Sequence, residues 1–182
     1  VYPWMASQGI STDFRTIDLL RAYGSAEYAN STVHSVVKEL SLVIANLPLK
    51  FYKNNDEDLE KLRSSHPLVK LFWKPNPAMT RFDFWEATVV LLELTGECFW
   101  GLEGIDDRGR PKEIWVLNPL YTKPIPDAKN FVKGYTYTIN DKIVNYLPEE
   151  IIHLKYCNPV DMFRGQSSLM ASRQQIINDY LI

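Results

Sequence analysis

The spacing of apolar residues in the first third of the chain predicts its clearest helix. Apolar side chains recur at steps of three and four residues, which places them on one helical face. Asn30 or Ser31 can cap the N-terminus of this helix, and Pro48 prevents its continuation. The stripe consists of Val33, Val36, Val37, Leu40, Val43, Ile44 and Leu47. A weaker pattern predicts an earlier helix over residues 14–23, and residues 1–12 are expected to be flexible.

Prolines and capping residues in the next segment predict two further helices. Pro67 suits the first turn of a helix, and Pro75 forbids its continuation. Thr80 can cap the following helix, with Asp83 placing a favourable negative charge near its N-terminus. Gly96 stands where a left-handed C-terminal cap would fall, so the second of these helices is expected to end just before it.

After this glycine the pattern changes from helical to strand-like. Polar turns separate the apolar segments, and one of them, Asn140-Asp141, consists of two residues that tolerate positive φ. The predicted strands cover residues 98–100, 114–117, 135–139, 142–146 and 151–156. A short strand over residues 49–52, followed by a polar loop over residues 53–58, is expected ahead of them.

The order of these elements predicts one α+β domain over residues 1–182, with N-terminal helices, an antiparallel strand meander and a C-terminal helix. The last helix is expected to begin at Ser167 and to carry apolar residues such as Ile176 and Leu181 toward a partner. The chain has no initiator methionine and stops inside an uncapped helical pattern. We therefore expect it to be a fragment of a longer protein.

Composition narrows the class of protein. With 182 residues, 46% hydrophobic and 23% charged, the chain can bury a real core and is not disordered. Its formal net charge of −2 argues against a DNA-binding surface spread over the molecule, but leaves a local basic patch open. No apolar run reaches the roughly 18 residues of a membrane-spanning helix, so no membrane association is predicted. Cys98 and Cys157 are expected to pack as small apolar residues in a reducing compartment.

The most suggestive chemical groups are Ser167 and His153. The segment Gly165-Gln166-Ser167-Ser168-Leu169 superficially resembles a nucleophile elbow, but Leu169 stands where that turn needs a second glycine. Ser167 is therefore interpreted as a helix N-cap. His153 lies in the middle of a predicted strand, and the nearest acidic residues along the chain precede that strand, so we interpret it as a structural histidine.

Other motifs are incomplete. The segment 104–110 has the glycine spacing of a phosphate loop but lacks its Lys-Ser/Thr pair, and the acidic run 56–58 lacks the regular ligand pattern of a calcium loop. His34 and His66 have no zinc-pair partner at the required spacing. Thus we predict no catalytic residue, cofactor or metal site. Two alternatives stay open: a small hydrolase or nuclease using Ser167, His153 and an aspartate, or an α+β binding module with a deep apolar pocket.

Five segments in serial order carry a family resemblance. They are His66 to Thr80, Leu94 to Trp100, Trp115 to Pro119, Glu150 to Leu154 and Gly165 to Leu169. In this order and spacing the chain resembles the portal proteins of tailed double-stranded DNA bacteriophages, of the long-tailed type. The likeness runs from Ser31 to the C-terminus. It departs from the family pattern at Ser168, where a proline is usual, although helix starts accept either residue.

The resemblance implies that the chain is the N-terminal, largely wing, portion of a portal protein. Such proteins form a dodecameric ring at one capsid vertex, through which DNA enters during packaging and leaves during infection. The large terminase docks on the ring as the motor, head-completion proteins bind later, and the portal itself hydrolyses no ATP. The protein would be made in the bacterial cytoplasm and reside in the virion. Because much of the longer subunit would be missing, residues 1–182 alone are expected to be monomeric or weakly associated.

Overall fold

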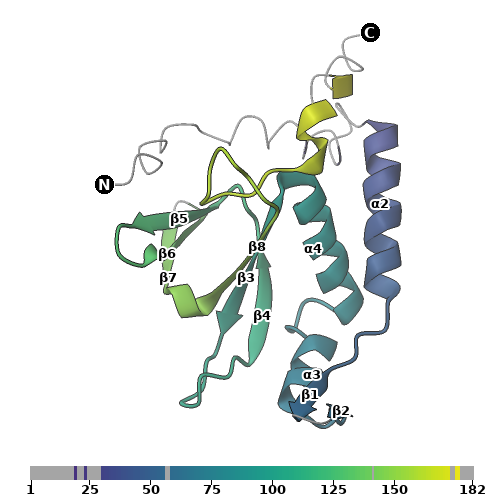
Figure 1. The fold of residues 1–182 in the computed structure, drawn as a ribbon, viewed down its shortest axis with the longest axis vertical. Coiled ribbons are helices and arrows are strands. Elements are labelled where there is room, and N and C mark those ends of the chain that lie inside the picture. Colours follow the sequence, from purple (N-terminus) through teal and green to yellow (C-terminus); the bar gives the residue numbers. More distant parts are fainter. Residues whose placement is uncertain are drawn as a thin grey trace.

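The computed structural model describes Leu19, Tyr23 and residues 30–55, 58–140, 142–172 and 175–176. Figure 1 shows helices α2, α3 and α4 on one side of the molecule and strands β3 to β8 on the other, with β1 and β2 beside α3. The helices are α2 (Ser31–Asn46), α3 (Pro67–Trp73) and α4 (Arg81–Thr95), with 3-10 turns η2 (Pro148–Glu150) and η3 (Ser168–Ser172). The strands are β1 (Tyr52–Asn55), β2 (Asp58–Lys61), β3 (Glu97–Glu103), β4 (Glu113–Leu117), β5 (Thr122–Asp127), β6 (Phe131–Ile139), β7 (Lys142–Tyr146) and β8 (Ile151–Lys155). The predicted α+β class is confirmed.

The helix ends follow the capping residues that the sequence presents. The Asn30 side chain accepts a hydrogen bond from the Val33 N–H at 3.0 Å, which begins α2. Thr80 and Asp83 form a reciprocal capping box at the start of α4, and Gly96 ends that helix with φ of 81°. Of the predicted helix over residues 14–23, the structure describes only Leu19 and Tyr23, and both are helical.

In the described part of the chain, the strands form two three-stranded antiparallel sheets and one hairpin. Their strand orders are β4-β3-β8, β5-β6-β7 and β1-β2. The predicted hairpins β3–β4 and β6–β7 are confirmed, and Asn140 in the β6–β7 turn has φ of 47°. Strand β8 returns to pair with β3 on the side opposite β4, which makes β3 the central strand of its sheet.

The core lies on both faces of β3. One face carries Cys98 and Trp100, which pack with Phe84 of α4. The other face carries Phe99, which packs with Tyr135 of β6 and Ile151 of β8. Since both faces are covered, five consecutive residues from Glu97 onward are buried. Helix α2 packs outside α4, as Figure 1 shows.

Two predictions about the edges of the fold were wrong. Residues 49–51 are not a strand, and the hairpin β1–β2 occupies most of the segment expected to be a polar loop. Its described side chains are exposed, so the strands show no apolar alternation. Cys157 is exposed rather than packed, whereas burial raises the pKa of Cys98 to about 12 and keeps it a thiol.

The described residues cover only part of the predicted C-terminal helix. Residues after Ser167 begin a 3-10 turn, and Ile176 is helical and packs with Val33, Val37 and Leu94. Residues 177–182, including the predicted partner-facing Leu181, lie outside the described residues. Within the described part of the chain, no helix combines the length and apolar character needed to cross a membrane.

Candidate functional site

A buried charged cluster forms at the start of β3. The Glu97 side chain is 3% exposed and accepts hydrogen bonds on both carboxylate oxygens. Oε2 accepts from His153 Nε2 and from the Gly165 N–H, each at 3.0 Å. Oε1 pairs with the Arg164 guanidinium at 2.5 Å. One carboxylate therefore fastens β8 and the segment that follows it to the central strand.

Strand register explains why these groups meet. Phe99 lies opposite His153 in the β3–β8 pairing, and their rings stack with centroids 4.1 Å apart. Glu97 lies two residues before Phe99 and so faces the same side of the sheet. Arg164 also donates to the carbonyls of Thr122 at 2.8 Å and Pro119 at 3.0 Å, which connects the cluster to the start of β5. The cluster joins three segments of the chain.

Two glycines allow the segment after β8 to lie against the end of α4. A Cβ at Gly165 would stand 2.0 Å from the Gly96 carbonyl oxygen. A Cβ at Gly96 would stand 2.2 Å from the Gln166 carbonyl carbon. The two backbones thus approach more closely than any side chain permits.

Glu93, near the end of α4, is a second anchor for this segment. Its backbone carbonyl accepts from the Ser167 hydroxyl at 2.5 Å, and its carboxylate accepts from Ser168 and from the Tyr156 hydroxyl. Burial and the hydrogen bond to Glu93 raise the pKa of Tyr156 to about 12, so its phenol stays protonated at neutral pH and remains the donor.

This arrangement does not form a nucleophile constellation. The Ser167 hydroxyl donates to the Glu93 carbonyl and accepts from the Leu169 N–H at 3.0 Å, whereas His153 Nε2 faces Glu97. Activation of a serine requires its hydroxyl to donate to the base. Ser167 instead occupies the predicted N-cap position, before a 3-10 turn. Among the described residues, no three His, Cys, Asp or Glu side chains are grouped to hold a metal ion.

We expect Ser167→Ala to lower the free energy of unfolding by about 1 kcal/mol without changing the fold, because it removes the cap and one buried donor. Urea denaturation measures this change. Ser168→Ala is the matched control, because that hydroxyl is exposed and its loss should cost less. An equal or larger loss for the control would show that the cap does not stabilise the fold.

Sequence reasoning found His153 and Ser167 but missed Glu97 and Arg164. From the sequence, only the acidic residues directly before the strand of His153 stood out as possible partners of this histidine. Glu97 lies 56 residues earlier, and its carboxylate comes alongside His153 only when β8 pairs with β3. The available signal was the position of Glu97 directly before an apolar strand segment, because a charged residue in that position is expected to be partly buried at the sheet.

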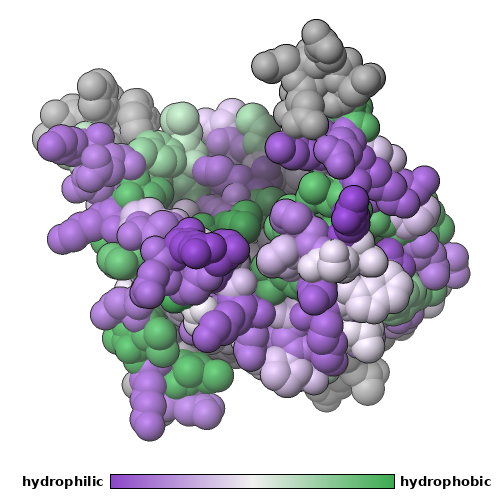
Figure 2. Space-filling model, turned by 90° about the horizontal axis from the view of Figure 1, so that it is seen from below, coloured by the Kyte–Doolittle hydropathy of each residue, from purple (hydrophilic) through white to green (hydrophobic). Residues whose placement is uncertain are grey.

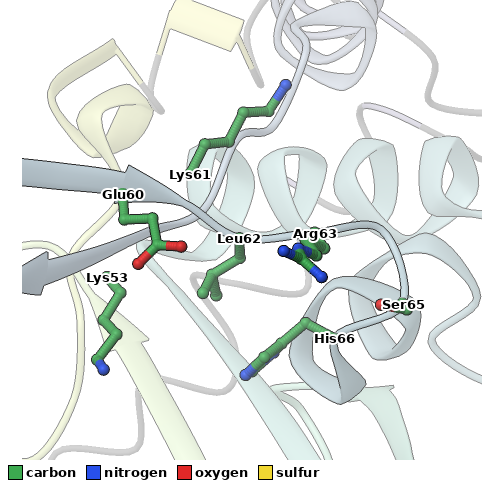
Figure 3. Close-up of a pocket in the computed structure, with 7 residues that line it drawn as sticks. All are labelled: Lys53, Glu60, Lys61, Leu62, Arg63, Ser65 and His66. Carbon is green, nitrogen blue, oxygen red and sulfur yellow. The ribbon is translucent and has the colours of Figure 1, made fainter.

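A second surface of interest surrounds α3, at the end of the molecule where β1 and β2 lie (Figure 1). One hollow of about 240 Å³ is lined by Lys53, Glu60, Lys61, Leu62, Arg63, Ser65 and His66. Figure 3 shows Lys53, Leu62 and His66 on one side of this segment, with Lys61 pointing the opposite way. A second hollow of about 450 Å³ is lined by Pro67, Lys70, Leu71, Lys74, Asp106, Arg110, Pro111 and Lys112. In Figure 2, which views the molecule from this end, hydrophilic side chains cover much of the surface.

Apolar side chains are exposed on two opposite sides of the molecule. On α2, the outward face presents Val36 and Val43, which are 59% and 58% exposed. On β7, Ile143 is 66% exposed, and its neighbour Val144 is exposed as well. Figure 1 places α2 and β7 on opposite sides. The apolar stripe predicted from the sequence is therefore divided between two faces of α2. Val33 and Val37 pack inward, whereas Val36 and Val43 face outward.

Comparison with solved structures shows a shared fold. The neck of an empty gene transfer agent particle contains a chain that matches 95% of this one, with a TM-score of 0.78 and 22% identity. The neck of the native particle, computed with C12 symmetry, matches 94% with a TM-score of 0.75 and 22% identity. This chain covers 45% and 44% of those chains, so it spans less than half of their length.

Comparison by sequence identifies the family. An uncharacterized protein of Rickettsia bellii is 28% identical over 149 residues, which cover 79% of this chain and 37% of that protein. The family description "Phage portal protein" matches residues 31–180, which is most of the chain and the same span that carries the serial motifs. The chain therefore belongs to the phage portal protein family.

Proposed function

We propose that this chain is the wing portion of a portal subunit, which forms a ring at one capsid vertex and acts as a conduit for DNA. The observation that carries the proposal is the family match over residues 31–180. The similarity in fold to a chain in the necks of gene transfer agent particles supports it. The role is structural rather than enzymatic, and the hydrogen bonds of Ser167 and His153 favour this over the hydrolase or nuclease alternative.

A ring of identical subunits needs two different contact faces on each copy. Head-to-tail contacts form a ring when the rotation from one copy to the next closes, and in a ring of many copies the two contact faces lie on roughly opposite sides of each subunit. The outward face of α2 and the edge strand β7 meet this requirement in position, and both carry exposed apolar side chains (Figure 1). Contiguous exposed apolar residues mark association surfaces. We infer that they contact neighbouring copies in a dodecamer, the order that the C12 symmetry of one neck structure suggests.

The proposed partners follow from this position. The large terminase and the head-completion proteins would dock on the ring, and the capsid would surround it. Double-stranded DNA would pass through the tunnel without sequence specificity, because a sliding duplex must not be held tightly by its phosphates. The protein would be made in the cytoplasm of a bacterial host and reside in the virion.

The full-length protein that contains this sequence tests the proposal. Native mass spectrometry is expected to find a closed ring of twelve subunits. Val43→Glu should abolish or strongly reduce the ring, because it places a charge in an apolar contact, while monomer stability should change little at this exposed position.

Ser35→Glu, an exposed polar position on the same helix, is the matched control and should leave the ring intact. A full-length protein that stays monomeric would contradict the proposed function. A ring that tolerates Val43→Glu would contradict only the placement of the contact on α2.

A further inference from the structure

The β1–β2 hairpin is a two-stranded sheet that no other described strand joins. Its described side chains are exposed, including the apolar Tyr52 at 49% and Leu59 at 68%. The register places Tyr52 opposite Lys61 and Leu59 opposite Asn54, so both apolar side chains lie on one face of the hairpin. Figure 3 shows Lys61 of that face pointing away from Lys53, which lines the hollow beside α3. An isolated hairpin is at best marginally stable in water, so a further strand would stabilise this one.

Strand β7 lies at the edge of its sheet and is exposed over most of its length. The β6–β7 hairpin closes at the pair Ile139–Lys142, and the closing pair of a two-residue turn is hydrogen-bonded. Hydrogen-bonded and non-hydrogen-bonded pairs alternate along the strands, so Ile143 and Asn145 direct their backbone N–H and C=O groups away from β6. No described strand pairs with them on that side. Such a row of backbone groups is a template for another strand.

Two other sheet edges carry protection that β7 lacks. On β4, the Ile114 N–H donates to the Pro75 carbonyl, and the Ile114 carbonyl accepts from the Asn76 side chain, each at 2.8 Å. Strand β5 contains Pro124 and Pro126 and a register shift beside the second proline, and such features blunt an edge against pairing. Strand β7 contains no proline and pairs with β6 without a register shift. Its edge is therefore available for pairing.

Charge and position match the hairpin to this sheet. Residues 52–61 contain four carboxylates and two lysines, a formal charge of −2. Residues 122–146, which span β5, β6 and β7, contain four lysines and two aspartates, a formal charge of +2. Opposite charges steer two surfaces together and fix their register. Figure 1 places β1 and β2 beside α3 and β7 on the other side of the molecule, so the hairpin of one copy can meet the β7 edge of another copy but not its own.

We propose that the β1–β2 hairpin of one subunit adds to the outer edge of β7 in a second copy of this chain, which makes one five-stranded sheet across the two copies. The contact joins two different surfaces, so it is head-to-tail and can repeat around a ring. Main-chain hydrogen bonds supply affinity, and the exposed Tyr52, Leu59 and Ile143 supply apolar contacts between strands. This inference rests on the proposed portal function and specifies how neighbouring subunits join.

The first test measures proximity in the ring of the full-length protein. In a Cys157→Ser background, which removes an exposed thiol, Tyr52→Cys and Ile143→Cys are combined and treated with a short bismaleimide crosslinker. A denaturing gel should show a ladder of covalent oligomers, because each copy is joined to the next through different residues. Each cysteine alone should give no ladder. The matched control pairs Tyr52→Cys with Arg108→Cys, an exposed residue of the β3–β4 connection, and should also give none.

The second test removes one main-chain donor from the β7 edge. Ile143→Pro deletes the N–H that faces away from β6, a position where an edge strand tolerates proline, so the β6–β7 pairing should survive. Ile143→Thr is the control, because it loses the apolar side chain but keeps the N–H in a strand-forming residue. By native mass spectrometry, Ile143→Pro should raise the subunit concentration needed for ring assembly about tenfold or more, and Ile143→Thr about threefold or less. Circular dichroism checks that both variants keep the wild-type fold.

The outcomes separate this contact from the portal function. An intact ring that gives no ladder from the two cysteines would overturn the inference and leave the portal function standing. Dimers formed through either cysteine alone would also overturn it, because like edges would then pair with each other. Equal effects of Ile143→Pro and Ile143→Thr would refute strand addition, since side chains alone would form the contact. A wild-type full-length protein that stays monomeric would contradict the portal function and, with it, the inference.

Discussion

Glu97→Ala is expected to destabilise the fold by about 3–5 kcal/mol, because it leaves the Arg164 guanidinium partly buried without its carboxylate. The same change removes the acceptor of His153 Nε2 and of the Gly165 N–H. The loss should appear as a large fall in the urea midpoint. Glu103→Ala is the matched control, because Glu103 lies on the same strand, is exposed, and its carboxylate accepts a hydrogen bond from the Tyr146 hydroxyl at 3.0 Å.

A double variant separates the charge from the packing. Glu97→Ala combined with Arg164→Met should recover a measurable part of the lost stability, since no unpaired charge then stays at the start of β3. If the two single changes were simply additive, the pair would not be coupled. That result, or a loss for Glu97→Ala no larger than for Glu103→Ala, would refute the anchoring role assigned to this cluster.

Gly165→Ala is expected to cost about 3 kcal/mol or more, because its Cβ would stand 2.0 Å from the Gly96 carbonyl oxygen and 2.9 Å from the Glu97 Cβ. Neither neighbour is the mobile end of a side chain, so the segment after β8 must move away from α4. Thermal denaturation and circular dichroism measure the loss, and the hydrogen bonds of Glu97 with Arg164 should weaken with it.

Gly109→Ala is the comparison for this prediction. Gly109 has φ of 72°, but a Cβ there meets nothing within 4 Å, so the substitution should cost only about 1–2 kcal/mol of backbone strain. Similar losses for the two variants would show that the close approach at Gly165 does not constrain the fold.

Local chemistry explains which elements could be predicted. Thr80 with Asp83 fixed the start of α4, and Gly96 fixed its end, because capping involves residues within one turn of each other. The β6–β7 hairpin was predicted from its two-residue turn for the same reason. The β1–β2 hairpin was not predicted, because its exposed side chains follow no apolar alternation.

The candidate surfaces were predicted less completely. The stripe on α2 was visible in sequence, but its division into an inner face with Val37 and an outer face with Val43 depends on where α4 packs.

The sequence by itself determined the boundaries of α2, α3 and α4, the two long hairpins, the α+β class and the family, since each rests on local spacing or on motifs in serial order. Tertiary structure alone decided the pairing of β8 with β3 and the burial of Glu97 against His153 and Arg164. These contacts join residues more than fifty positions apart. A carboxylate in a sequence carries no sign of the partners that packing will bring to it, because their approach depends on the whole core rather than on its neighbours.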